Sequence, residues 1–442
     1  MSRDTVHDFL AIGLGPFNLG LACLTEPVKE LDGIFLEART EFDWHPGMLL
    51  AGATLQVPFL ADLVTLADPT SAYSFLAYLK DVGRIYPFYI RESFYPLRRE
   101  YNDYCRWAAD RLGSIRFGQR VTRVEHDGEA YVVMSATGER HRARRLVLGT
   151  GTSPYVPEAL SGLVGDGPVT HSAHYLEHKR ALQERRSITV VGSGQSAAEV
   201  YADLLSEIDD HGYRLTWLTR SPRFFPMEYT KLTLELTSPE YTAYFQGLPA
   251  RVREPLLRDQ RSLYKGISGE TVNAIHDALY AREVAGGTDT TLLTSTEVIG
   301  ARRSTAGYTL DLRHGETGEE FALETEAVVL ATGYRPTTPT LLDPVRDRLR
   351  WDGHGRLLAG PTYAVDHEQR EVFVQNAEEH THGFVAPDLG MGAYRNSVII
   401  AAMAGREIYP VEKRIAFQEF GVPDRLRAPQ AVRADLAMEG AR

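Results

Sequence analysis

The sequence predicts an α/β protein with two Rossmann-like dinucleotide-binding domains, the second inserted in the first, and a small substrate-proximal subdomain. Glycine-rich turns at residues 13–18 (GLGPFN) and 192–199 (GSGQSAAE) each follow a short apolar strand and open a helix. Two further apolar strands, at 144–151 and 326–334, end in small-residue turns and close the segments that the glycine turns begin. This recurrence indicates two bound nucleotides, because a chance glycine cluster lacks the strand and helix around it.

The first strand and turn predict an FAD site. VHDFLAIG has strand character, and the glycines that follow let the backbone approach a pyrophosphate at a helix N-terminus. Glu37 ends the next apolar run, GIFLE, at about the 20-residue separation where a carboxylate meets ribose hydroxyls. A ribose without a 2′-phosphate, as in FAD, suits that carboxylate. The predicted contacts are Gly13, Gly15, Pro16, Phe17, Asn18 (in place of a third glycine) and Glu37.

The second turn predicts an NADPH site. SITVVG precedes it, and the next strand, RLTWLTR, ends in Arg220 instead of a carboxylate, with Arg223 just beyond. A guanidinium suits a 2′-phosphate, which favours NADPH over NADH, although either arginine could instead lie on a solvated loop. The predicted contacts of this turn are Gly192, Gly194, Gln195 and Ser196. Thr332 and Gly333, in the ATG turn of the closing strand, are also predicted to contact a cofactor.

Breaks in the alternation of strands and helices divide the chain into its expected domains. A Pro/Gly stretch at 153–168 and the YRPTTPT segment mark boundaries. We expect the first part of the FAD domain at 1–166 and the NADPH domain, with an inserted substrate-proximal segment, at 167–334. The return of the FAD domain and a C-terminal tail are expected at 335–442. Loops and helices near the active cleft are expected within 221–285, and hairpin strands around 308–323.

The composition argues against several classes of protein. The chain has 442 residues, is 43% hydrophobic and carries a net charge of −11 without a basic block, which argues against nucleic acid or an anionic membrane as a partner. It has neither an apolar run of about 18 residues nor a signal-peptide pattern at its start, so we expect a cytoplasmic protein. Cys23 and Cys105 form no CxxC pair and are expected to be a helix-packing residue and a half-buried thiol. Without a vicinal dithiol, oxygen is the plainest acceptor for electrons that leave the flavin.

Segments outside the turns resemble the N-hydroxylating flavoprotein monooxygenases of siderophore biosynthesis. The resemblance rests on FDWHPGMLL, LQVPFLADLVTLADPTSAYSFLAYL, GSGQSAAE, ATGY and HTHGFVAPDLG, and it extends from residue 8 to about residue 408. It implies that FAD, NADPH and dioxygen hydroxylate a terminal amine through a C4a-hydroperoxyflavin. It also implies a homodimer or homotetramer.

The resemblance assigns roles to several side chains. Gln56 is expected beside the isoalloxazine as a catalytic residue, and His45 and Met48 are expected to shape the flavin cleft, with ordinary packing as the alternative. Ser268 in KGISGE and Ser238 in LTSPE align with asparagines near the substrate and nicotinamide in ornithine-type members. Ser268 is therefore predicted to be catalytic, and Ser238 to contact the substrate.

Two departures from the ornithine-type pattern point to the substrate. Ala61 stands where those members place a lysine for the substrate carboxylate, and Gly390 stands where they place a substrate-contacting serine. A buried carboxylate without a cation is strongly disfavoured, which favours a diamine, putrescine or cadaverine, over an amino acid. Asp388 could pair with the distal ammonium, with Asp62 as a weaker candidate. Helix capping is the alternative role for Asp388.

Other functions remain open at this stage. L-lysine or L-ornithine hydroxylation is the main alternative, followed by a flavin monooxygenase acting on sulfur or a ketone, and by a redox sensor without turnover. His380 and His382, beside Glu378 and Glu379, have the spacing of metal ligands, but no third ligand set is apparent. No metal is therefore expected.

Overall fold

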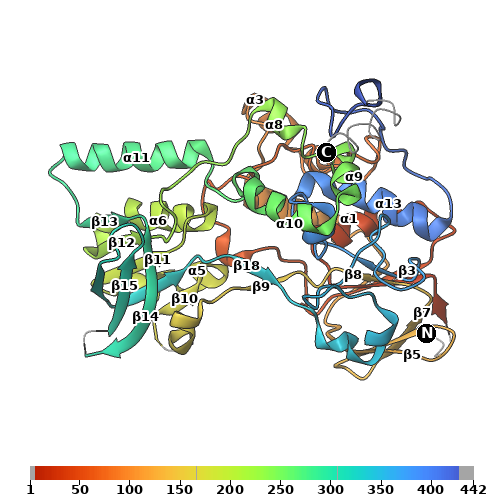
Figure 1. Cartoon of the computed structure of the whole chain (residues 1–442), viewed down its shortest axis with the longest axis horizontal. Helices are drawn as coiled ribbons and strands as arrows, with labels where there is room; N and C mark the ends of the chain where they lie inside the picture. Colours follow the sequence, from red (N-terminus) through yellow and green to blue (C-terminus); the bar gives the residue numbers. More distant parts are fainter. Residues whose placement is uncertain (1–4, 166, 306, 428–442) are drawn as a thin grey trace, which may run out of the picture.

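The computed structural model describes residues 5–165, 167–305 and 307–427, and its core is a pair of five-stranded parallel sheets in two lobes (Figure 1). The first sheet has the order β19-β8-β2-β3-β4, with β2 Phe9–Ile12, β3 Gly33–Leu36, β4 Ile115–Arg116, β8 Leu146–Leu148 and β19 Val372–Val374. The second has the order β10-β17-β11-β12-β13, with β10 Val169–His171, β11 Ser187–Val191, β12 Arg214–Leu218, β13 Thr290–Leu293 and β17 Ala327–Leu330. The predicted α/β class with two Rossmann-like sheets is confirmed.

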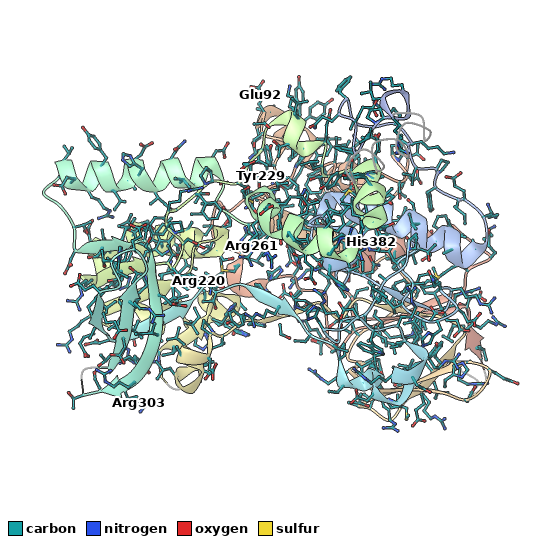
Figure 2. All side chains as sticks on the ribbon, in the orientation of Figure 1. Glu92, Arg220, Tyr229, Arg261, Arg303 and His382 are labelled. Carbon is teal, nitrogen blue, oxygen red and sulfur yellow. The ribbon has the colours of Figure 1, made fainter. Side chains whose placement is uncertain are left out.

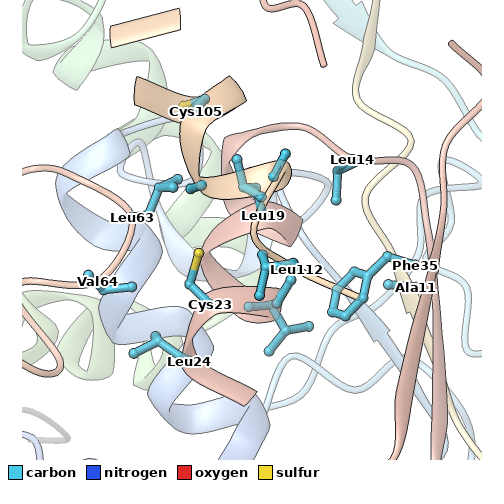
Figure 3. Packing of buried hydrophobic residues seen from close by; sticks show 14 of the residues in the cluster. Ala11, Leu14, Leu19, Cys23, Leu24, Phe35, Leu63, Val64, Cys105 and Leu112 are labelled. Atoms are coloured by element: carbon cyan, nitrogen blue, oxygen red, sulfur yellow. The ribbon is translucent and has the colours of Figure 1, made fainter. Parts of the chain in front are cut away.

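Helix α1 (Pro16–Thr25) anchors the first lobe. It is almost wholly buried, because it lies between the sheet and two more helices, α4 (Arg98–Ala109) and α13 (Gly392–Ala404). Figure 3 shows Cys23 of α1 and Cys105 of α4 within this core. Both cysteines are free and fully buried, so the expectation of a half-buried thiol was wrong. An apolar thiol packs as a small hydrophobe here.

Helix α6 (Gln195–Ser206) has the same place in the second lobe. Its small residues Ala197 and Ala198 are fully buried in the core of that lobe, together with Ile188 and Val190 of β11. Small side chains at the start of a helix let it pack closely on the strand before it. Helix α5 (Tyr175–Gln183) contributes Tyr175 and Leu182 to the same core.

The chain crosses between the lobes in an antiparallel strand pair, β9 (Thr152–Pro154) with β18 (Tyr334–Pro336). Each lobe also carries a small sheet. The first has β1 (Val6–His7), β7 (Arg140–Ala143), β6 (Tyr131–Ser135) and β5 (Val121–His126). The second has β14 (Thr296–Ser304), β15 (Gly307–His314) and β16 (Glu320–Thr325). The antiparallel pair β15–β16 lies where hairpin strands were expected.

The segment after β12 folds into α8 (Lys231–Leu234), α9 (Pro239–Gly247), α10 (Ala250–Asp259) and α11 (Gly269–Val284). Figure 1 shows α8, α9 and α10 over the first lobe and α11 over the second. Tyr241 and Phe245 of α9 pack with Phe384 and Met391 of the C-terminal segment. Within the described residues, no helix is long and apolar enough to cross a membrane. Residues 428–442 of the expected tail lie outside the described residues.

Candidate active site

A cavity of about 1650 Å³ is lined by residues of both lobes. This is larger than the roughly 300–1000 Å³ typical of one small ligand, and it suits two nucleotides and a substrate. Figure 2 labels three lining residues, Arg220, Arg261 and Tyr229, in the region between the two sheets. The predicted residues that line it are Pro16, Phe17, His45, Met48, Gln56, Gly192, Gly194, Gln195, Ser196, Arg220, Thr332, Gly333 and Asp388.

The first glycine turn has the geometry of a phosphate cradle. Gly13 has φ +86°, and a Cβ there would lie 2.5 Å from the carbonyl oxygen of Gly149 on the neighbouring strand end. Gly15 precedes α1, has open space where its Cβ would be, and in the described structure no side chain caps this helix. The free N–H groups of a helix N-terminus favour an anion. Glu37 accepts from the backbone N–H of Leu14 (2.7 Å) and of Arg39 (2.8 Å), which brings its carboxylate beside the turn.

A chain of buried amides holds this turn in place. Asn18 Nδ2 donates to the carbonyl of Gly13 (2.7 Å), and Gln375 Nε2 donates to Asn18 Oδ1 (2.9 Å) and to Asn396 Oδ1 (3.0 Å). Asn396 Nδ2 donates in turn to the carbonyl of Phe17 (3.1 Å). The side chain of Asn18 therefore supports the backbone of the turn. Sequence reasoning missed Gln375 and Asn396, because their partners in the turn, Asn18 and Phe17, lie more than 350 residues away along the chain.

The second glycine turn also has the geometry of a phosphate cradle. Gly192 has φ +150°, and a Cβ there would overlap the carbonyl of Ala331, which only glycine avoids. Gly194 precedes α6 and has open space where its Cβ would be, and no side chain caps α6 in the described structure. Arg220 follows β12 and lines the cavity, whereas Arg223 lies over the ring of Phe225, 5.8 Å from its centroid, and is not among the lining residues. Arg220 is therefore the better placed of the two for a 2′-phosphate.

Two predicted serines are helix caps instead of site residues. Ser238 is buried; its Oγ accepts from the N–H of Tyr241 (3.2 Å) and donates to the carbonyl of Glu235 (2.7 Å). Ser268 caps α11 by accepting from the N–H of Thr271 (3.2 Å). Neither is among the residues that line the cavity. The predicted catalytic role of Ser268 and the predicted substrate contact of Ser238 are corrected, because both hydroxyls serve helix N-termini.

The loop after β3 brings aromatic and polar groups to the cavity. His45 has φ +51°, and its ring meets those of Trp44 and Tyr334 edge-on. His45 is exposed to the cavity, and desolvation by the protein around it, followed by the guanidinium groups of Arg98 and Arg39, lowers its pKa to about 4. The imidazole is therefore neutral at physiological pH.

Gln56 and Met48 reach the cavity from the same part of the chain. The side chain of Gln56 lines the cavity and donates to the carbonyl of Thr54 (3.3 Å). Met48 also lines the cavity, but its side chain is buried in the core of the second lobe. Packing, the alternative considered for Met48, is thus one of its roles.

Ala61, Asp388 and Gly390 come together, and of the three only Asp388 lines the cavity. A Cβ on Gly390 would lie 3.7 Å from the Cβ of Ala61 and 3.1 Å from Asp388 Oδ1. Asp388 lines the cavity, and its Oδ1 accepts from the N–H of Gly390 (2.7 Å), as a capping carboxylate does. Burial raises the pKa of Asp388, while the Gly390 hydrogen bond and Arg395 act in the opposite direction. Within the described residues its Oδ2 has no hydrogen-bond partner, so that oxygen is free for a ligand.

Asp62 is excluded as a ligand for the substrate. Its carboxylate accepts from the N–H groups of Val64, Thr65 and Phe75 and from the hydroxyl of Thr65, at 2.6 to 2.9 Å. An ionised carboxylate has about four acceptor positions, and these four donors occupy them. The weaker of the two predicted ammonium partners was therefore wrong.

Comparison with known proteins identifies the family of this chain. Residues 5–336 match the family model described as L-lysine 6-monooxygenase/L-ornithine 5-monooxygenase. The chain belongs to this family.

Relatives of this N-monooxygenase family match over nearly the whole chain. A putrescine N-hydroxylase of Shewanella oneidensis is 47% identical, over 96% of this chain and 87% of that protein. The FAD-bound cadaverine monooxygenase of the desferrioxamine pathway from Erwinia amylovora has a TM-score of 0.92 at 50% identity, covering 95% and 100% of the two chains. An ornithine N-hydroxylase of Kutzneria sp. 744, with reduced FAD, NADP⁺ and L-ornithine, has a TM-score of 0.85 at 28% identity, covering 91% and 99%.

In this family member, sequence reasoning also missed lining residues from the inserted segment. Tyr229, Arg261 and Lys265 line the cavity, and the only sequence signal for them was the mixed aromatic and charged composition of 221–285. Burial, followed by the charge of Asp388, raises the pKa of Tyr229. The inserted segment therefore forms part of the wall of the cavity that Asp388 also lines.

Of the two histidines of the HTH segment, His382 packs in the interior, whereas His380 lines the cavity. No group of metal ligands is formed by the part of the chain that the structure describes. His382 is buried and stacks on Tyr363, with ring centroids 4.1 Å apart. Burial lowers the pKa of His382 well below 6.5, and that of His380 to about 4. Both rings are neutral in the folded protein.

These neutral histidines predict a pH-dependent stability. The unfolded chain takes up protons below about pH 6.5 whereas the folded chain does not until about pH 4, so the histidine contribution is lost as pH falls through that window. We expect His382→Phe, which keeps the stacked ring, to reduce the loss of unfolding free energy between about pH 7 and pH 5 by roughly 1 to 2 kcal/mol. Urea titrations of both proteins at the two pH values measure this. An identical pH dependence in the two proteins would contradict it.

Proposed function

We propose that this protein hydroxylates one terminal amine of an aliphatic diamine, putrescine or cadaverine, with FAD, NADPH and dioxygen, giving an N-hydroxydiamine for a hydroxamate siderophore. The observation that carries the proposal is the carboxylate of Asp388 beside Ala61 and Gly390. An anion at this place attracts an ammonium group and repels a carboxylate. Relatives named for putrescine and cadaverine, at 47% and 50% identity, support it.

The two cradles fit the two nucleotides. Gly13, Gly15 and the start of α1 would hold the pyrophosphate of FAD, while Gly192, Gly194 and the start of α6 would hold that of NADPH. Arg220 would meet the 2′-phosphate. FAD, once reduced by NADPH, supplies the oxygen-activating chemistry of the family. We also propose that the division at residues 166/167 and 334/335 separates the parts that carry the two cofactors.

The residues around Asp388 can bind a diamine with one end charged and the other neutral. An alkyl ammonium has a pKa of about 10.4, so the reacting nitrogen must lose a proton before it can accept oxygen. Removal of that nitrogen from water lowers its pKa, whereas pairing with Asp388 stabilises the charge of the distal nitrogen. The two ends of a symmetric molecule are thereby distinguished by what surrounds them. Gln56 and the neutral His45 line the cavity and offer polar contacts that add no charge.

A comparison of four amines tests the proposal. We expect kcat/KM for hydroxylamine formation from putrescine or cadaverine to exceed that from L-ornithine and L-lysine by at least about 100-fold, a difference of roughly 3 kcal/mol in transition-state binding. NADPH consumption and hydroxylamine yield would be measured together. Efficient, coupled turnover of either amino acid would overturn the choice of substrate. Binding of both nucleotides without NADPH consumption, with or without an amine, would instead favour a redox sensor.

One observation favours an amino acid as the second candidate. Arg261 and Lys265 line the cavity, and either cation could pair with a substrate carboxylate. Lys265 already lies over the ring of Tyr264, 4.8 Å from its centroid. If the substrate is an amino acid, Lys265→Ala raises its KM; if it is a diamine, the same variant leaves the KM of the diamine unchanged.

A further inference from the structure

A buried ion pair joins the two lobes next to the cavity. Arg98 is the first residue of α4, which contributes Tyr101, Tyr104 and Cys105 to the core of the first lobe. Glu199 lies in α6, the helix that begins at the second glycine turn. Their contact therefore runs from the first lobe to the helix that carries the predicted NADPH cradle.

The geometry of this pair is specific. Arg98 Nη1 and Nη2 donate to Glu199 Oε2 and Oε1, both at 2.8 Å, and the exposed fractions of the two side chains are 10% and 9%. Nη1 also donates to the carbonyl of Met48 (3.0 Å), and the backbone N–H of Arg98 donates to the carbonyl of Ala53 (2.8 Å). A bidentate pair holds two planar groups in one orientation, unlike a contact through a single bond. It therefore constrains the angle between the lobes as well as their distance.

The hydrogen bonds of Glu199 continue into the second glycine turn. Gln195, the first residue of α6, donates from Nε2 to Glu199 Oε1 (2.9 Å) and accepts at Oε1 from the N–H of Ser268 (2.7 Å). Arg98 and Gln195 both line the cavity, whereas Glu199 does not. Glu199 thus connects one lining residue of each lobe without facing a ligand itself.

Stability alone is a weak reason for this pair. Burial of two charges costs several kcal/mol in lost hydration, and apolar side chains of similar volume are often as stabilising. Met48 and Leu50, in the core of the second lobe, already join the lobes through apolar packing. An oriented pair adds a fixed relative position, which the transfer of a hydride between two bound cofactors requires.

We propose that Glu199 is a positioning residue that, through Arg98 and Gln195, holds the nicotinamide in register with the flavin. The inference rests on the proposed use of FAD and NADPH. In that step a hydride, with both electrons, leaves the nicotinamide ring and one proton comes from solvent, so that NADPH, FAD and H⁺ become NADP⁺ and FADH₂. If the nicotinamide shifts relative to the flavin, hydride transfer slows. NADPH binding is not weakened, because the predicted phosphate contacts lie within one lobe.

Glu199→Gln tests the inference, because it keeps the shape of the side chain and removes the charge. Flavin reduction by NADPH would be followed without oxygen by stopped flow in the FAD-loaded protein. We expect the limiting rate to fall roughly 10- to 100-fold, as a displacement of about 1 Å does, and the Kd of NADPH to stay within about threefold. Amide hydrogen exchange in residues 44–53, which needs no activity, should become faster.

Asp203→Asn is the matched control. Asp203 lies one turn further along α6 and accepts from Tyr175 (2.6 Å) and Lys179 (2.8 Å), both in α5 of the same lobe. It should leave the limiting rate of reduction and the exchange of 44–53 unchanged. An equal loss in both variants, or a normal rate in Glu199→Gln, would overturn the inference. If NADPH fails to reduce the flavin of the unsubstituted protein, the proposed function fails instead, and hydrogen exchange still tests the contact.

A second variant covers the case in which Glu199→Gln does not fold. Arg98→Met combined with Glu199→Met replaces the pair by apolar side chains, which a buried site of this kind tolerates. The double variant should bind FAD and NADPH yet reduce its flavin slowly. Normal flavin reduction by this variant would also overturn the inference.

Discussion

Replacement of Gly13 by alanine is expected to give a protein that retains no FAD. The backbone there has φ +86°, and the new Cβ would lie 2.5 Å from the carbonyl oxygen of Gly149. Strain of a non-glycine residue at positive φ and the overlap together cost roughly 2 to 5 kcal/mol. The ends of β2 and β8, between which the cradle forms, would be forced apart. Visible flavin absorbance of the purified protein and its thermal unfolding measure the effect.

Gly15→Ala separates damage to the fold from damage to the ligand site. Gly15 has open space where its Cβ would be and no positive φ, so the FAD-free protein should be as stable as the unsubstituted one. The added methyl group faces the expected pyrophosphate, so its FAD affinity should nevertheless fall. If Gly13→Ala purifies with a full complement of FAD, the first turn is not the FAD cradle.

Asp388→Asn is expected to raise the KM of putrescine or cadaverine roughly 10- to 100-fold. A hydrogen bond to a charged group contributes roughly 1.5 to 3 kcal/mol, and the amide keeps the shape of the carboxylate but not its charge. NADPH oxidation in the absence of amine should stay near normal, because it does not involve the distal ammonium. Steady-state kinetics with each diamine measure the change, and an unchanged KM would place the ammonium contact elsewhere.

A monoamine of matched length is the control for this variant. Butylamine and pentylamine lack the distal ammonium, so their KM should be the same in both proteins. The pH dependence gives a second check with a definite sign. Burial raises the pKa of Asp388, so the KM of a diamine should rise as pH falls through that raised pKa and the carboxylate gains a proton. In the Asp388→Asn variant, this rise in the KM of the diamine at low pH should be absent.

The glycine turns could be predicted from the sequence because each is a local pattern. Gly13 and Gly192 both have the positive φ and the close approach that their places in the pattern require. The two serines show where a local pattern was misread. Ser238 precedes a proline, and Ser268 stands at the start of a helical run, so both carry the ordinary signal of a helix N-terminus. Alignment of loops to distant relatives gave them site roles that the structure does not support.

Asp62 and Asp388 show what could not be predicted. Both are acidic residues in loops, and no property of either local sequence reveals how many N–H groups the folded backbone directs at each. Asp62 accepts four hydrogen bonds, whereas Asp388 accepts one and lines the cavity. Met48 likewise belongs by sequence to the flavin loop, yet its side chain packs in the core of the other lobe.

The sequence by itself determined the α/β class, the two nucleotide cradles and the absence of the expected carboxylate partners at Ala61 and Gly390. These follow from strand periodicity, glycine conformation and residue identity, which are properties of short segments. Only the tertiary structure decided which partners hold the cradles: Gln375 for Asn18, 357 residues away, and Glu199 for Arg98, 101 residues away. Contacts of such separation depend on how whole helices and sheets pack, because burial, and not local propensity, selects the partner of a polar side chain.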